Sequence, residues 1–120
     1  GCTLNGTTGA LTCIDAITTG RHQWAKGAAV ASASPLVLGA DGNYFHVTGT
    51  VTISEVSPTS WQAGSQVCLN FDAVATVTHN SGGTNDLMLA GSVNLTTSAN
   101  TILCLIYDSP DWHETSRKVP

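Results

Sequence analysis

The feature that most constrains the fold is an alternation of apolar and polar side chains between residues 42 and 56. Apolar side chains take odd positions and mostly hydroxyl side chains take even ones, with Gly49 in the middle: Phe45, Val47, Val51 and Ile53 against His46, Thr48, Thr50, Thr52 and Ser54. A period of two residues is that of a β-strand with one buried face. We therefore predict a strand with an apolar inner face and an outer ladder of hydroxyl groups.

Similar short apolar segments, separated by turn-forming residues, follow along the rest of the chain. The sequence predicts strands at 36–38, 66–72, 75–79, 87–89, 93–96, 101–107 and 112–119. The segment 101–107 is apolar at nearly every position, as in a central strand covered on both sides. Ser, Thr, Asn and Gly are abundant and strong helix formers are scarce. These patterns predict a single all-β domain. Its architecture would be an antiparallel sandwich, a jelly-roll-like fold or a small barrel.

The length of 120 residues fits one domain with its own core. Residues 1–34 differ in character from the remainder and end in a run of small residues without amphipathic pattern, so we predict an extended N-terminal arm there and a β domain over 35–120. Because the chain begins at Gly1 rather than Met, we expect that an initiator, a leader or part of a larger precursor has been removed.

The chain carries little charge, and this limits its partners. Only 10% of the residues are charged, against roughly 25% in an average soluble protein. The basic residues are few and lie toward the two ends of the chain: Arg21, Lys26, Arg117 and Lys118. Such a set does not build a phosphate-binding patch, so we expect no nucleic-acid partner. No apolar run is long enough to span a bilayer, so we expect no membrane partner.

Four cysteines form two candidate pairs. Cys2 and Cys13 bracket a segment with two glycines that allows a tight reversal, which favours a disulfide closing a small loop. Cys68 and Cys104 each fall within a predicted strand, where they either bridge two strands or remain buried thiols. Neither pair has the C-x2-C spacing of a zinc site.

Candidate catalytic groups are sparse. The histidines at 22, 46, 79 and 113 share no metal-binding spacing, and the segment PDWHET gives the densest polar cluster, with Asp111, His113 and Glu114. No third ligand or nucleophile accompanies that cluster in the sequence, so we interpret it as a polar turn. Nucleophile elbows, P-loops and dinucleotide-binding motifs are also absent from the sequence. We therefore predict a protein that is not an enzyme and has no cofactor and no metal.

The three tryptophans lie outside the strongest strand patterns, next to polar residues: Trp24, Trp61 and Trp112. Tryptophans in such positions either pack at the edge of a core or anchor protein interfaces. We take all three as interface candidates, together with the hydroxyl ladder Thr48, Thr50 and Thr52, which would meet another subunit without desolvating charge.

The order of four segments resembles a small all-β module found in structural proteins of tailed-bacteriophage virions. The segments are DGNYFHVTGTVTISEV, AGSQVCLNFDAVATVTHN, LMLAGSVNLTTSANTILCLIYD and WHETSR, and together they cover about residues 36–117. Cys68 departs from the module, which usually has another residue at that strand position, and the arm with Cys2 and Cys13 lies outside the match.

The resemblance implies a virion component, usually a homotrimer. Within the virion we expect a capsid decoration (cement) protein on the outer capsid surface, whose partners are the major capsid protein and its own copies. The sequence contains no fibre shaft, and an extended arm suits a protein that adds strands to its neighbours. The alternative is a tail-fibre or spike module that recognises a host glycan or protein, with Trp61 and the loop NSGGTND as its candidate site. A secreted cellular adhesin is a third alternative.

Overall fold

The computed structural model describes residues 2–4, 6–7, 11–13 and 23–120 of the chain, and in them the protein is all-β. The strands in chain order are β1 (Cys2–Leu4), β2 (Leu11–Cys13), β3 (Val30–Ala31), β4 (Tyr44–Thr48), β5 (Gln66–Phe71), β6 (Thr76–Val77), β7 (Leu87–Met88), β8 (Leu95–Thr96), β9 (Thr101–Tyr107) and β10 (Trp112–Lys118). A single 3-10 turn, η1 (Ala90–Ser92), lies between β7 and β8. The predicted all-β fold class is therefore confirmed.

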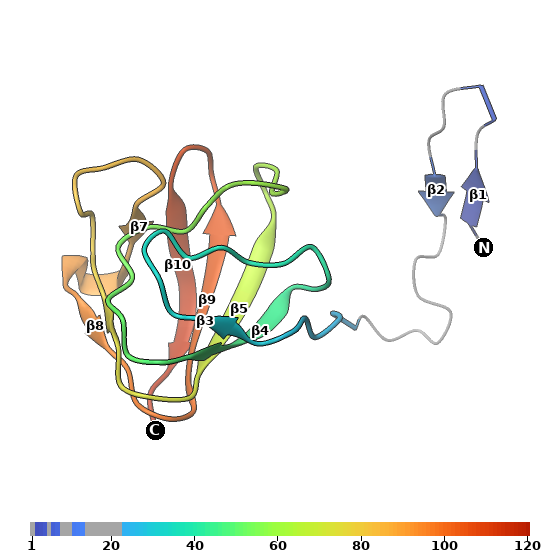
Figure 1. Cartoon of the computed structure of the whole chain (residues 1–120). Coiled ribbons are helices and arrows are strands. Elements are labelled where there is room, and N and C mark those ends of the chain that lie inside the picture. Colours follow the sequence, from blue (N-terminus) through green and yellow to red (C-terminus); the bar gives the residue numbers. More distant parts are fainter. Residues whose placement is uncertain (1, 5, 8–10, 14–22) are drawn as a thin grey trace.

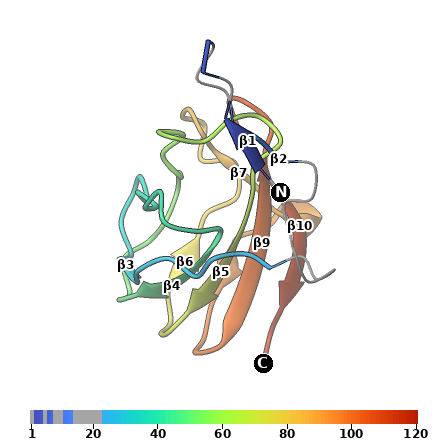
Figure 2. The same cartoon turned by 90° about the vertical axis from the view of Figure 1, so that its right-hand side faces the viewer.

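A six-stranded sheet forms the main body of the molecule, in the order β3-β4-β5-β9-β10-β7. Figure 1 shows it curling into a half-barrel, with long connections and the small β6-β8 sheet on the concave side. Figure 2 shows the sheet and the segments on its concave side after a turn of 90°. The convex side carries no second layer of described strands, so the sheet has one face toward the core and one outer face.

The sheet is mixed, whereas the sequence pattern suggested purely antiparallel pairing. Strands β5, β9 and β10 pair antiparallel, but β3 with β4, β4 with β5 and β10 with β7 are parallel. Parallel neighbours need a long crossover. Residues 49–65 provide it between β4 and β5, and isolated bridges such as Ile53 with Val77 attach this segment to the concave side. Strand periodicity does not encode such a crossover, because it reports which side chains are buried and not the direction of the neighbouring strand.

The predicted strand over residues 42–56 is shorter in the structure. It ends at Thr48 because Gly49 has a φ of +83°, a left-handed conformation that stops the strand. Val51, expected on the buried face, is 55% exposed, and the buried position returns only at Ile53. Thr48, Thr50 and Thr52 therefore do not form one ladder: only Thr48 belongs to β4.

Most other predicted strands are present with adjusted bounds. The prediction at 101–107 matches β9 residue for residue, and those at 66–72 and 112–119 are each one residue longer than β5 and β10. The predictions at 75–79, 87–89 and 93–96 shrink to two-residue strands. In the segment 36–38 only a single bridge forms, between Leu36 and Val56.

The core fills the concave side of the sheet. Strand β9 lies between β5 and β10 and buries alternate residues there, including Leu103 and Leu105. The largest fully buried side chain is Trp112, whose indole Nε1 donates a hydrogen bond to the backbone oxygen of Val56 at 3.2 Å. That bond connects the last strand to the crossover segment and gives the buried N–H its acceptor.

Residues 23–34, which the sequence assigned to the arm, run along the edge of the sheet. Val30 and Ala31 form β3 beside β4, and backbone bonds extend the contact on both sides, from Gly27 N to Tyr44 O at 2.9 Å and from Ser32 N to Thr48 O at 2.7 Å. Strands β1 and β2 form a separate antiparallel pair.

Candidate functional site

The outer face of the sheet is held together by a disulfide. Cys68 on β5 and Cys104 on β9 are direct cross-strand partners with Cα atoms 4.1 Å apart, and their sulfurs are bonded. Both side chains are half-buried and lie on the side opposite the core, because their neighbours Leu69 and Leu103 point inward. Of the two possibilities that the sequence left open for this pair, the structure has the bridge.

The other candidate pair lies in β1 and β2. The backbone register of this hairpin places Cys2 directly opposite Cys13. This is the backbone arrangement that a cross-strand disulfide needs, but the two side chains lie outside the described part of the structure. The Cys2–Cys13 bridge stays a prediction.

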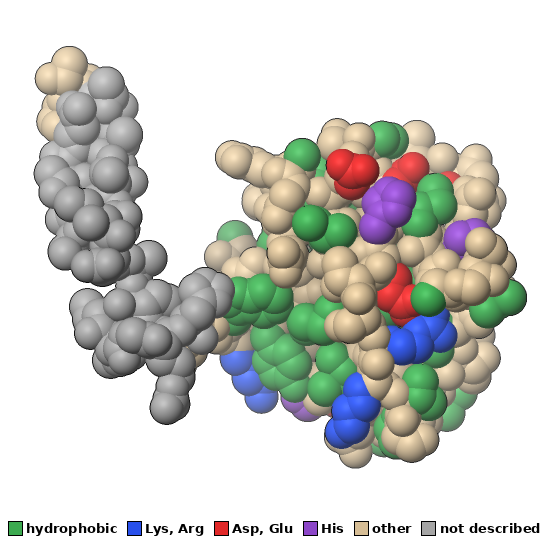
Figure 3. Space-filling view, turned by 180° about the vertical axis from the view of Figure 1, so that it is seen from behind, with side chains coloured by type: hydrophobic (Ala, Val, Ile, Leu, Met, Phe, Trp, Pro, Cys, Tyr) green, Lys and Arg blue, Asp and Glu red, His purple; other side chains and the backbone are tan. Residues whose placement is uncertain are grey.

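An apolar depression of about 520 Å³ opens on the outer face beside the disulfide. Its lining comes from the edge segment and from three strands: Trp24, Tyr44, Cys68 and Ile102. Trp24, one of the interface candidates, is 36% exposed. Figure 3 shows hydrophobic side chains grouped on this side of the molecule, next to the point where the described chain resumes. The outer face thus offers apolar surface to solvent.

Polar contacts on the same face are few and hold β4 to its neighbours. The ring of Tyr44 meets His46 edge-on, and its hydroxyl accepts a hydrogen bond from Asn70 at 2.9 Å. His46 Nδ1 lies 2.6 Å from the carboxylate of Asp72. The side-chain oxygen of Asn70 is buried and has no hydrogen-bond partner among the described residues. These contacts fix the aromatic ring at the rim of the depression.

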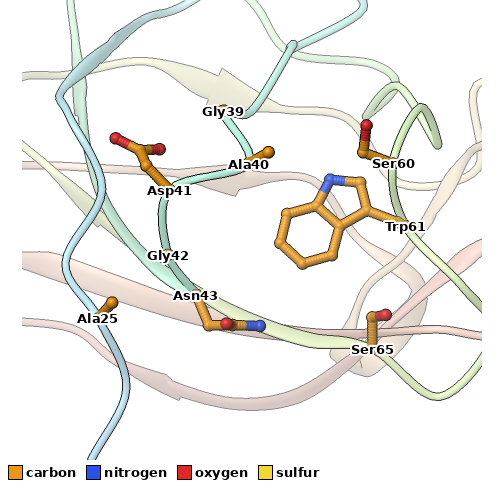
Figure 4. Close-up of a pocket in the computed structure, with 9 residues that line it drawn as sticks. All are labelled: Ala25, Gly39, Ala40, Asp41, Gly42, Asn43, Ser60, Trp61 and Ser65. Atoms are coloured by element: carbon orange, nitrogen blue, oxygen red, sulfur yellow. The ribbon is translucent and has the colours of Figure 1, made fainter. Parts of the chain in front are cut away.

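A second depression, of about 460 Å³, lies at the end of the sheet around Trp61. Its walls are the 39–43 turn, the 60–65 loop and Ala25 of the edge segment, and the residues that line it are Ala25, Gly39, Ala40, Asp41, Gly42, Asn43, Ser60, Trp61 and Ser65 (Figure 4). The Trp61 ring is the one large apolar group of this lining. Its Nε1 is buried and has no acceptor within the described ranges.

Glycines make the close approach of these walls possible. A Cβ added to Gly42 would lie 2.3 Å from the backbone oxygen of Ala25, and one added to Gly39 would lie 2.5 Å from the Asp41 carboxylate. Asp41 in turn accepts a hydrogen bond from the backbone of Ala28 at 2.7 Å. The turn is therefore packed directly against the edge segment that precedes β3.

Trp112, the third tryptophan, was wrongly taken as an interface candidate. It is 0% exposed and packs against Trp61, with ring centroids 5.7 Å apart and planes at 79°, and against Tyr107 at 4.8 Å. A partner could reach it only if the core opened. Polar neighbours in the sequence misled the prediction because, in a strand, the side chains on either side of a buried residue point to the opposite face.

The polar cluster in PDWHET is divided among separate structural contacts. Asp111 accepts a hydrogen bond from the backbone of Asp86, and His113 lies 3.8 Å from Asp108. Glu114, whose side chain is 2% exposed, pairs with Arg117 at 2.5 Å. Hydrogen bonding to Glu114 raises the pKa of Arg117 above its ordinary value.

The loop NSGGTND is organised by its own aspartate. Asp86 is buried and accepts hydrogen bonds from the Ser81 hydroxyl at 2.5 Å and from Gly82 N at 3.1 Å. None of the residues lining the Trp61 depression comes from this loop. The sequence had paired Trp61 with the loop, whereas the structure pairs it with the 39–43 turn.

The described residues contain no cluster of three or more His, Cys, Asp or Glu side chains placed to hold a metal ion. No described helix has the length and apolar character needed to cross a bilayer. Comparison of the chain with protein-family models, curated proteins and solved structures gives no match.

Sequence reasoning found Trp24 and Trp61 but missed the residues that complete each depression. The sequence did not predict Tyr44, Asp41 or Asn43 as site residues. The signal available was the pair Gly39 and Gly42, which flank Ala40 and Asp41, since glycine marks positions of close backbone approach as well as turns. Nothing local indicated that the 60–65 loop would face them.

Proposed function

We propose that this chain is a structural protein of a tailed-bacteriophage virion, and within it a capsid decoration protein that binds the outer surface of the coat and stabilises it. The order of its four strand segments, which resembles that module, supports the virion assignment. The proposed partners are the major capsid protein and two further copies of the chain in a homotrimer. The proposed location is the outer capsid surface.

The observation that carries the proposal is the outer face of the sheet. It presents an apolar depression bordered by Trp24, Tyr44 and Ile102, and a disulfide and short polar contacts hold it rigid. Interfaces are typically built on aromatic and aliphatic anchors that are already fixed before binding, because little side-chain entropy is then lost. Two lysines border these groups, Lys26 beside Tyr44 and Lys118 opposite Ile102, so a partner that covers the depression meets apolar side chains with positive charge at the rim.

Charge inserted into the depression tests the proposal. Ile102 has Asn70 and Lys118 as its cross-strand neighbours, so Ile102→Glu places a carboxylate near a lysine and should leave the fold intact. We expect the variant to lose trimerisation in light scattering and binding to expanded capsids in a sedimentation assay. Val93→Glu is the matched control, since Val93 is 59% exposed and lies next to β8, away from the outer face. A wild-type chain that is monomeric and does not sediment with capsids would refute the proposal.

A receptor-binding module of a tail fibre or spike is the second candidate, and the Trp61 depression is the observation that favours it. Copy number separates the two roles. Several hundred copies per particle in a quantitative protein gel would support decoration, whereas a few trimers per particle would support the tail.

A further inference from the structure

We propose that the depression around Trp61 is a binding site for a neutral saccharide. This inference stands on the lining of the depression alone and does not depend on capsid decoration. The volume of about 460 Å³ lies within the range of roughly 300 to 1,000 Å³ that is usual for small-molecule sites. Its lining combines one aromatic ring with small and polar residues, which suits a ligand that has an apolar face and many hydroxyl groups.

The aromatic wall is fixed in place before any ligand arrives. The ring of Trp61 packs edge-to-face on the fully buried Trp112, and its backbone N–H donates to Pro58 O at 3.0 Å. The same loop is tied to the end of β9 by two backbone bonds, Gly64 N to Tyr107 O at 2.7 Å and Tyr107 N to Ser65 O at 2.8 Å. A ring held in this way can stack on the C–H face of a pyranose at a small entropic cost.

The polar wall leaves both donors and acceptors available. The Asn43 amide nitrogen donates to Gln66 O at 2.7 Å, and its side-chain oxygen has no partner among the residues described. The Ser65 hydroxyl accepts from Gln62 N at 3.2 Å, which leaves its hydrogen free to donate. Figure 4 shows Asn43 and Ser65 on the same side of the depression, below the ring of Trp61. Because a sugar hydroxyl both donates and accepts, it matches this mixed set.

Backbone groups and charge further restrict the class of ligand that fits the depression. The backbone amides of residues 40–42 make no hydrogen bond within the described part of the chain, and Ser60 adds a hydroxyl at the rim. Asp41 is the one charged side chain of the lining. The negative charge of Asp41 repels ligands that carry a carboxylate or a phosphate. The structure therefore favours uncharged sugars over sialic and uronic acids.

The test fills the depression without touching the core. Ala40 is exposed in the 39–43 turn, so Ala40→Trp puts an indole into the space that the sugar would take. Ala99→Trp is the matched control, because Ala99 is exposed in the turn before β9 and does not line the depression. The probes are methyl glycosides of glucose, galactose, mannose and N-acetylglucosamine, with N-acetylneuraminic acid and glucuronic acid as the charged comparison. Binding is measured by saturation-transfer NMR and titration calorimetry on the full chain.

We expect at least one neutral glycoside to bind, with affinity at least about tenfold weaker in Ala40→Trp and unchanged in Ala99→Trp. The conservative variant Trp61→Phe should keep the fold and reduce saturation transfer to the sugar C–H protons. Absence of binding to all four neutral glycosides, equal binding by Ala40→Trp, or tighter binding of the charged sugars would each overturn the inference. A chain that coats capsids but binds no saccharide overturns this inference alone, and a chain that binds saccharide but not capsids overturns decoration alone.

Discussion

Removal of the Cys68–Cys104 disulfide should destabilise the domain by an amount that can be calculated from chain length. The two residues are separated by 36 positions, so reduction releases a loop of that size in the unfolded chain. In the chain-entropy model this loop corresponds to about 4 kcal/mol of unfolding free energy at 25 °C. For 120 residues the melting temperature falls by roughly 4 °C per kcal/mol, which gives a shift of roughly 15 °C.

The double variant Cys68→Ser/Cys104→Ser is the suitable perturbation, because both side chains are half-buried on the outer face and a hydroxyl there costs little. Urea unfolding followed by tryptophan fluorescence measures the loss, with Trp112 in the core as the reporter. The m-value should rise, since an unfolded chain without the cross-link is more expanded.

Two controls separate the disulfide from other effects. Reduced wild-type protein should unfold at the same urea concentration as the double variant. Reductant added to the double variant then reports on Cys2 and Cys13 alone, and a mass increase of two hydrogen atoms would show that they were bonded. A loss of less than about 1 kcal/mol for the double variant, with an unchanged m-value, would refute the chain-entropy reasoning.

Three further contacts are tested by substitution, the first two by urea unfolding and the third by hydrogen exchange. Trp112→Ala should cost about 3 to 5 kcal/mol because it empties the centre of the core, whereas Trp24→Ala on the outer face should cost clearly less, since 36% of Trp24 is already exposed to solvent; similar losses for both would contradict the burial. Asp86→Ala should cost about 1 to 3 kcal/mol because its loop loses two hydrogen bonds, and the exposed Asp108→Ala should have no measurable effect. Gly42→Ala should accelerate hydrogen exchange in the edge segment, since its Cβ would meet a backbone oxygen at 2.3 Å, and unchanged exchange would contradict that contact.

The sequence pattern predicts a strand best where the alternation of buried and half-buried side chains continues along the whole strand. Strand β9 buries every second residue from Thr101 to Tyr107 and is half-buried at the positions between, so its apolar sequence reports its central position directly. The segment after Thr48 shows the opposite case. Alternation continues through Val51, but Gly49 turns the chain, and the same apolar pattern then lies on a crossover and no longer on a strand.

Some site residues could likewise be chosen from the sequence, whereas their environment could not be predicted. Tryptophan and cysteine are noticeable in any sequence, so Trp24, Trp61 and the pair Cys68 and Cys104 could be selected as candidates. Whether each is exposed, buried or bonded depends on contacts between distant segments. Trp112 illustrates this dependence, because its acceptor lies 56 positions away on Val56 and no local pattern connects the two.

The sequence by itself determined that the chain is built of short strands, that it carries little charge and where most of the strands lie. These properties follow from side-chain size and polarity at neighbouring positions, which act over a few residues. Only the tertiary structure decided that the sheet is mixed and open on its outer face, that Trp112 is core and Trp24 surface, and that Trp61 faces the 39–43 turn. Those outcomes depend on contacts between segments that are distant in the sequence, such as those made by the crossover of residues 49–65. The periodicity of neighbouring residues contains no information about such contacts.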